Sequence, residues 1–150
     1  MATTVTDANL TVTITDSVTL NGQAYGNTNT LTVASIDEVY NRVVEVPISA
    51  FTAIVQLGTT GQGSITAANA KYIRITNLDD TNYVNLKVFG TDAMVVKLEA
   101  GKSFILGGVS FDAIASADIA QGAVSHNAAF VISAEATVAA CDVEVFVASV

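Results

Sequence analysis

Apolar and polar residues alternate strictly along many short stretches of this chain. In residues 10–15, LTVTIT, the apolar residues Leu10, Val12 and Ile14 alternate with three threonines. Alternation of this kind places apolar side chains on one face of a strand and hydroxyl side chains on the other, so it predicts a half-buried strand. Similar stretches, rich in Thr, Val and Ile and separated by Gly, Asn and Asp, recur toward the C-terminus.

The first turn signal follows this stretch. Asn21-Gly22 tolerates positive φ angles and marks a tight turn, and a Gly-Asn-Thr loop then leads into a second strand from Leu31. Residues 35–47 carry apolar side chains on both parities, interrupted by charges. This pattern predicts one long strand that bends or shifts between packing surfaces, and Pro47 ends it because proline has no N–H for the ladder.

The middle of the chain continues with short strands and polar connections. It predicts a buried strand, a glycine-rich surface loop, a strand–turn–strand unit and two shorter strands, at residues 51–58, 58–70, 71–90, 94–98 and 103–106. Asn and Asp between 77 and 82 supply the turn of the strand–turn–strand unit, which is most simply a hairpin. Glu99 to Lys102 predicts a second hairpin turn, with Gly101 at a positive φ.

The last third of the chain changes in composition before it returns to strands. After Gly108 it is rich in alanine and serine, and a short helical turn near residues 114–120 is one interpretation. FVISAEATV and CDVEVFVASV then predict two closing strands.

Many short strands joined by turns, with almost no helix, indicate an all-β protein. We expect a single antiparallel β-sandwich or jelly-roll-like domain over residues 10–150. Alternation alone leaves a closed barrel as the alternative. Residues 1–9 are polar and unpatterned, and we interpret them as an N-terminal arm that becomes ordered on a partner.

Charge and hydropathy narrow the class of protein. The chain is 51% hydrophobic and 13% charged, with a net charge of −8, and its six basic residues all lie between Arg42 and Lys102. Nucleic-acid binding requires clustered positive charge, so we expect no direct contact with DNA or RNA. No stretch reaches the roughly 20 apolar residues of a membrane helix. The first ten residues lack a signal-peptide pattern, so we expect a protein made in a cytoplasm.

Three features look like chemistry at first sight. Gly101-Lys102-Ser103 has the ending of a phosphate-binding P-loop, but Val96 occupies the position of its first glycine and SFIL follows where a helix is needed. His126 is the single histidine and lacks a nucleophile motif around it. Cys141 is the single cysteine, and we interpret it as a small buried residue of a strand rather than a reactive thiol.

Carboxylates are the remaining candidates. Asp79-Asp80 could supply oxygens to calcium, although the spacing is not that of a calcium loop and a turn rich in Asx residues is the favoured interpretation. Asp37-Glu38 and Asp142-Glu144 would form a glycosidase pair only if folding brought them together. The chain has no tryptophan and few aromatic residues, which argues against sugar stacking. We therefore assign no catalytic, cofactor or metal residue.

Two stretches carry a resemblance to a known class of protein. NLTVTITDSVTLNGQAYGNTNTLTVASIDEVYNRVVEVP, and KYIRITNLDDTNYVNLKVFG leading into VVKLEAGKSFIL, resemble small structural proteins of tailed-bacteriophage virions over roughly residues 9 to 106. The resemblance implies a non-enzymatic virion component. A capsid decoration (cement) protein bound to the major capsid protein is the first expectation, and a head–tail or tail accessory protein is an alternative.

The low charge of the strands leads to a related expectation. Strand edges invite pairing, and this chain has few charges with which to block them. A homo-oligomer covers such edges, and we expect a trimer. A sugar- or receptor-binding β-sandwich module is the competing hypothesis, followed by an enzyme of unrecognised type.

Overall fold

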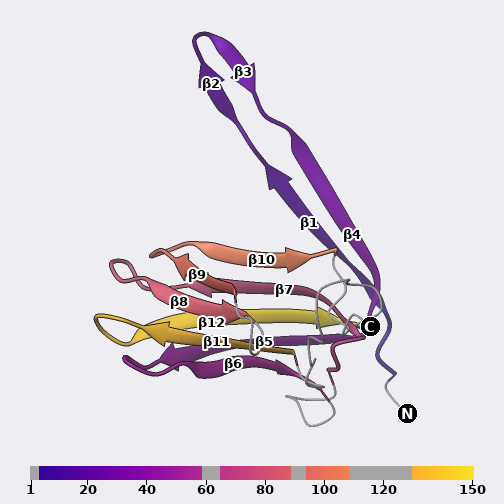
Figure 1. Ribbon diagram of the computed structural model, residues 1–150. Helices are drawn as coiled ribbons and strands as arrows, with labels where there is room; N and C mark the ends of the chain where they lie inside the picture. Colours follow the sequence, from indigo (N-terminus) through magenta and orange to yellow (C-terminus); the bar gives the residue numbers. More distant parts are fainter. Residues whose placement is uncertain (1–3, 59–64, 89–93, 109–129) are drawn as a thin grey trace, which may run out of the picture.

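The computed structural model describes residues 4–58, 65–88, 94–108 and 130–150 (Figure 1). Every regular element in these ranges is a β-strand. They contain no helix long and apolar enough to cross a membrane. The helical turn predicted near 114–120, His126, and part of the glycine-rich loop predicted at 58–70 lie outside the described residues.

Eight strands form two antiparallel four-stranded sheets that pack face to face. The strands are β5 (Glu38–Val46), β6 (Thr52–Leu57), β7 (Ala70–Asn77), β8 (Val84–Val88), β9 (Met94–Leu98), β10 (Ser103–Gly107), β11 (Phe130–Ala136) and β12 (Cys141–Ser149). Their order is β10-β7-β12-β5 in the first sheet and β6-β11-β8-β9 in the second. This arrangement confirms the predicted all-β sandwich, and these eight strands make two separate sheets rather than a closed barrel.

The path of the chain is that of a jelly roll. From β5 to β8 each strand lies in the opposite sheet from the one before it. The chain adds β9 beside β8, returns to the first sheet as β10, and then places β11 and β12 in the middle of the two sheets. Double-sheet structures of eight strands wound in this way are jelly rolls.

The core lies between the sheets and follows the alternation of the sequence. On β12 the odd-numbered valines point inward and are fully buried, while Asp142 and Glu144 point outward. The other strands contribute in the same way, and the largest fully buried side chains include Ile54, Ile73, Ile75, Leu86, Ile132, Val143 and Val145. Because period-two alternation gives each sheet one apolar face, the apolar faces of the two sheets pack against each other and form a single core.

Two predicted hairpins are wrong. β7 and β8 were expected to pair, as were β9 and β10, but in both cases the two strands lie in different sheets. The connection from β7 to β8 crosses the sandwich and is fixed by Asn77, whose side chain is fully buried. Its amide nitrogen donates to the carbonyl oxygens of Asn82 at 2.8 Å and Leu98 at 3.3 Å, which ties the crossing to the end of β9.

The turn before β10 has the local geometry that the sequence predicted. Gly101 has φ +67°, and the N–H of Lys102 donates to the carbonyl of Glu99 at 3.1 Å. The tight turn is therefore confirmed, but it joins strands of different sheets. Local alternation and turn residues identify a strand and its ends, whereas the choice of partner depends on distant strands.

Residues Ala8–Ile36 form a long hairpin that projects from the sandwich (Figure 1), called here the projecting hairpin. Its strands are β1 (Ala8–Thr15), β2 (Val18–Leu20), β3 (Gln23–Tyr25) and β4 (Thr28–Ile36). The single long strand predicted over 35–47 is divided at Asp37, where the chain leaves the hairpin and enters β5. Ser35 has φ +58° there, and the N–H of Asp37 donates to the carbonyl of Ser149 at 3.1 Å.

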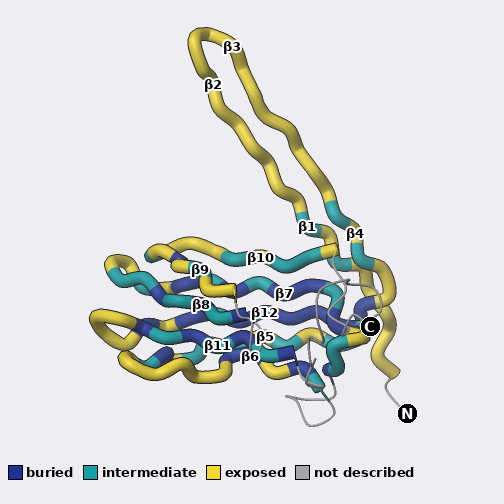
Figure 2. The backbone as a smooth tube through the Cα atoms, viewed as in Figure 1, coloured by how far each residue is buried: buried dark blue, intermediate teal, exposed yellow. Residues whose placement is uncertain are grey.

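Burial differs sharply between the two parts of the molecule. The strands β8 and β11 alternate between buried and partly buried positions, and β5 alternates between partly buried and exposed ones. Most of the projecting hairpin is exposed (Figure 2). The half-buried strand predicted for residues 10–15 is correct near the sandwich, where Leu10 and Val12 are partly buried. It is wrong further out, where Ile14 is exposed.

The core should be sensitive to loss of a single valine. We expect Val145→Ala to lower the free energy of unfolding by about 2–3 kcal/mol, from lost apolar burial and the cavity left behind. Val138→Ala is the matched control, because Val138 is 70% exposed in a loop, and its effect should stay below about 0.5 kcal/mol. Urea unfolding of the two variants makes the comparison, and equal effects would contradict the assigned core.

Candidate interaction surface

From Leu10 outward the projecting hairpin keeps one register to its tip, after a shift between Ala8 and Leu10. Leu10 faces Val33 at the base and Leu20 faces Gln23 at the tip, with each pair between them advancing by one residue on both strands. The turn is Asn21-Gly22, with φ +50° and +78°. Positive φ at both central residues is typical of a type I′ turn, whose twist matches a two-stranded ribbon. The tight turn predicted from this dipeptide is confirmed.

The two faces of the ribbon are chemically distinct. One face carries three cross-strand threonine pairs, namely Thr11 with Thr32, Thr13 with Thr30 and Thr15 with Thr28. The hydroxyls of the last pair lie 3.2 Å apart. The opposite face carries an apolar stripe whose members are Leu10, Val12, Ile14, Val18, Leu20, Tyr25, Leu31 and Val33. Asn29 and Gln23 share this face as the partners of Ile14 and Leu20. The alternation that predicted a strand therefore also separates a hydroxyl face from an apolar face.

The base of the apolar stripe packs on the outer face of the first sheet. Buried Tyr72 and Ala148 form a small second core there with Ile36, and Leu31 and Val33 of the hairpin pack against it. Tyr72 meets Phe146 edge to face, with ring centroids 6.0 Å apart and planes at 70°. Burial raises the pKa of the Tyr72 hydroxyl, and nearby Arg74 lowers it to a smaller extent.

A glycine allows this close approach of hairpin and sheet. A Cβ atom at Gly107 would lie 2.9 Å from Cδ2 of Tyr72 and 3.1 Å from Cδ2 of Leu31. Both distances are shorter than ordinary contacts between carbon atoms. The absence of a side chain on β10 at this position therefore leaves room for the hairpin to reach Tyr72.

A groove opens where the hairpin leaves the sheet. It has a volume of about 280 Å³ and is lined by Val12, Ile14, Asn29, Leu31, Tyr72, Ile105 and Gly107. The lining thus comes from the apolar face of the hairpin on one side and from the outer face of the first sheet on the other. Beyond the groove the hairpin is exposed to its tip (Figure 2).

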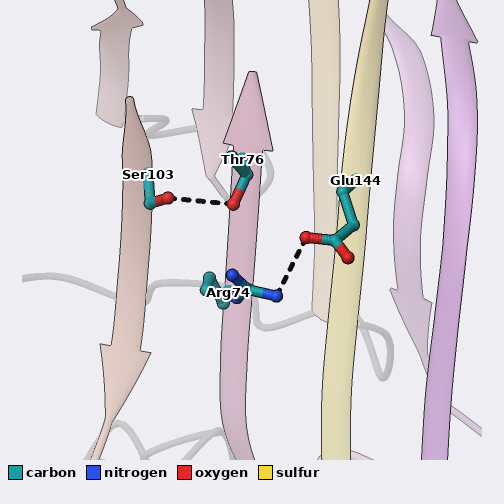
Figure 3. A network of polar contacts seen from close by, with 4 residues as sticks. All are labelled: Arg74, Thr76, Ser103 and Glu144. Atoms are coloured by element: carbon teal, nitrogen blue, oxygen red, sulfur yellow. Dashed lines mark hydrogen bonds and ion pairs between the residues drawn. The ribbon is translucent and has the colours of Figure 1, made fainter. Parts of the chain in front are cut away.

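The rest of this outer sheet face, called here the sheet face, is mostly uncharged. Its ion pair joins Nη2 of Arg74 to Oε2 of Glu144 at 2.9 Å, and the hydroxyls of Thr76 and Ser103 lie 2.9 Å apart beside it (Figure 3). The other outward positions of these strands include Val39, Asn41, Val43, Ile105 and Phe146. The acidic Glu45 and Asp142 lie opposite each other at the far end of the same face. Val39 and Val43 are 55% and 59% exposed. This is unusual, because the side of an antiparallel sheet that faces water usually carries polar residues.

Sequence reasoning did not identify this surface. The alternation of residues 10–15 showed an apolar face but not what covers it. The available signal was the presence of apolar side chains on both parities of residues 35–47, where Val39 and Val43 occupy the second face.

Asp79 and Asp80 lie beside a second hollow, at the end of the sandwich opposite the hairpin base. Its volume is about 390 Å³, and it is lined by Glu45, Leu78, Asp79, Asp80, Ala140 and Asp142. Oδ1 of Asp79 accepts from the N–H groups of Asn82 at 2.6 Å and Thr81 at 2.8 Å, which confirms the predicted Asx-type turn. The described residues contain no group of three or more ligands arranged to hold a metal ion.

The carboxylates considered as a glycosidase pair are not brought together. Glu45 lies opposite Asp142 in the sheet, whereas Glu38 lies opposite Ser149, at the other end of the same two strands. Glu38 and Glu144 are thus separated by about five strand positions, or roughly 16 Å along the sheet. Glycosidase carboxylates lie within about 10 Å of each other.

The other chemical candidates have structural roles where they are described. Cys141 is buried at the start of β12, as predicted, and burial, followed by the nearby Asp79 carboxylate, raises the pKa of its thiol. This shift disfavours the reactive thiolate. Lys102 directly precedes strand β10, which begins at Ser103 where a P-loop requires a helix, as the sequence indicated.

Comparisons with known proteins return no relative. No protein-family model, curated protein or solved structure matches this chain.

Filling the space at Gly107 should loosen the hairpin base. We expect Gly107→Ala to lower the free energy of unfolding by about 1–3 kcal/mol, because the new methyl group must displace the Tyr72 ring or Leu31. Faster proteolysis within the hairpin should accompany this loss. Ser103→Ala on the same strand is the control and should leave the rate of hairpin cleavage unchanged. If Gly107→Ala changes neither the free energy of unfolding nor the rate of hairpin cleavage, the close packing described above is contradicted.

The turn at Asp79 should make stability depend on pH. Hydrogen bonds from Asn82 and then Thr81 lower the pKa of the Asp79 carboxyl below its unfolded value, so its stabilisation is complete above the unfolded pKa, about 4. That stabilisation is lost as the pH falls through the lower, folded value. We expect Asp79→Asn to lower the urea midpoint at pH 7 and to approach the wild-type midpoint as the pH falls through the lowered, folded pKa of Asp79. A difference that stays constant as the pH falls would contradict this role.

Proposed function

We propose that this chain is a non-enzymatic structural protein of a tailed-bacteriophage virion. Within that class we propose a capsid decoration (cement) protein that binds and stabilises the lattice of the major capsid protein. A head–tail or tail accessory protein is the alternative within the same class. The chain would act in the virion after synthesis in the host cytoplasm.

The projecting hairpin is the observation that carries the proposal. A two-stranded hairpin is marginally stable in water unless another layer covers its apolar face. Here a 29-residue hairpin, Ala8–Ile36, extends beyond its own sandwich with an exposed apolar stripe. An extension of this kind is useful where neighbouring molecules stand at fixed distances and cover it, as in a protein lattice.

The fold and the charge are compatible with this role. Jelly rolls occur in viral capsid domains and also in lectins, so the fold alone supports the proposal only as an analogy. The resemblance of residues 9 to 106 to small virion proteins supports the same proposal. A net charge of −8 disfavours contact with packaged nucleic acid and favours attachment by apolar and neutral polar groups.

Partners follow from the same proposal. The N-terminal arm, residues 1–9, stays our candidate for ordering on the capsid, although Ala8 and Asn9 already belong to β1. A homo-oligomer, with a trimer favoured, would present several hairpins and several N-terminal arms together. Multiple weak contacts held in one assembly give a much higher overall affinity than each contact alone.

The number of copies in purified virus particles tests the proposal. We expect quantitative mass spectrometry of particles that contain this chain to find hundreds of copies, as a capsid lattice requires. About a dozen copies or fewer would instead favour the tail alternative. Absence of the chain from purified particles, while it is abundant in the infected cell, would contradict the virion proposal.

A further inference from the structure

The sandwich covers only the inner half of the apolar stripe on its own hairpin. Leu10, Val12, Leu31 and Val33 pack on the second core at the base. Beyond the groove the register continues without a shift, so alternate residues keep to the same face. The apolar members of this outer half, Val18, Leu20 and Tyr25, are 57%, 61% and 57% exposed.

A surface that matches this outer half is present on the same chain. The hairpin base covers one end of the sheet face, around Tyr72 and Ala148. Val39, Val43 and Ile105 remain exposed on the sheet face. The hairpin leads away from this sheet (Figure 1), so its tip does not lie on its own sheet face.

We propose that the outer half of the projecting hairpin packs on the sheet face of a second copy of this chain. The contact repeats the one already made within each molecule, in which the same apolar stripe lies on the same outer sheet face. It extends an existing intramolecular interface into the groove of about 280 Å³ between hairpin and sheet. This inference goes beyond the proposed virion function and does not depend on it.

The distribution of charge favours a second copy as the occupant. Two chains of net charge −8 repel each other, and 14 acidic residues are available to do so. The hairpin carries one of them, Asp16, which falls on the apolar face between Ile14 and Val18, and Glu144 on the sheet face is paired with Arg74. The proposed contact uses the apolar part of the sheet face around Val39, Val43 and Ile105. It leaves out the end that carries Glu45 and Asp142, which limits like-charge repulsion.

Other surfaces of the sandwich lack this property. The outer face of the second sheet carries Lys87, Lys97 and Glu135 on adjacent strands. The far end of the sheet face itself places Glu45 opposite Asp142. A partner of opposite charge would use such charged positions, whereas the outer half of the hairpin and the part of the sheet face around Val39, Val43 and Ile105 match each other in being apolar.

Self-association of the purified chain tests the proposal. We expect the wild-type protein to form an oligomer in size-exclusion chromatography with light scattering. The dissociation constant of the variant Val18→Thr, Leu20→Thr, Tyr25→Thr should rise by at least about 30-fold, because the variant removes the apolar groups but keeps strand propensity. Val39→Thr with Val43→Thr should weaken association in the same way from the other side of the contact.

The opposite face of the hairpin provides the matched control. Thr13→Ser, Thr19→Ser and Thr30→Ser alter three residues of the threonine face and should leave the oligomer unchanged. All of these substitutions are at exposed hairpin or sheet positions, so circular dichroism and the urea midpoint of the sandwich should match the wild type. A loss of association in the control equal to that of the apolar variants would overturn the proposal.

A disulfide test identifies the two surfaces directly. We expect Leu20→Cys in one chain and Ile105→Cys in a differently tagged chain to form a mixed disulfide under mild oxidation. Leu20→Cys with Val138→Cys should not, since Val138 lies in the loop after β11. Cys141 is not replaced in these variants because it is buried. The wild-type chain is the control for any disulfide that Cys141 itself forms.

The two proposals fail in different ways. A chain that remains monomeric at about 100 μM overturns the hairpin–sheet contact even if virus particles contain the chain. An oligomer that neither set of apolar substitutions weakens also overturns it. Absence from particles, with self-association intact, overturns only the virion proposal.

Discussion

The structure depends on one sheet that buries apolar side chains on both of its faces. The inner face of β10-β7-β12-β5 closes the sandwich core, while its outer face packs against the hairpin base through Tyr72 and Ala148. Antiparallel sheets more often expose one polar face to water. Here the second apolar face determines where the hairpin attaches and which way it leaves the molecule.

The sandwich and the hairpin therefore differ in how they are stabilised. The sandwich has its own core and long-range strand pairing, whereas the hairpin depends on the contact at its base, on its Asn21-Gly22 turn and on its cross-strand pairs. Such a ribbon is favourable for a molecule that meets neighbours, because its outer half contributes apolar area only when another surface covers it. The jelly roll acts as the rigid support, and the hairpin and sheet face are the surfaces through which we propose it assembles.

The sequence predicted local elements well and long-range pairing poorly. Alternation located most strands, and Asn21-Gly22, Gly101 and Asp79 marked real turns. The expected pairing of β7 with β8 failed because Asn77, a polar residue that resembled an ordinary turn former, is buried and directs the chain into the other sheet. The interaction surface was missed for a related reason: alternation gives each strand an apolar face but does not say whether that face meets the core, the hairpin or another molecule.

Hydrogen–deuterium exchange along the hairpin of the dilute protein tests the central claim most directly, namely that the hairpin is held at its base by the outer face of the first sheet. The account predicts slow exchange for the paired amides near Val12 and Leu31, and fast exchange for those near Val18 and Tyr25. Protection of the base amides should approach that of β7 and β12. Uniformly fast exchange from base to tip would contradict the account, because it would mean that the second apolar face does not hold the hairpin.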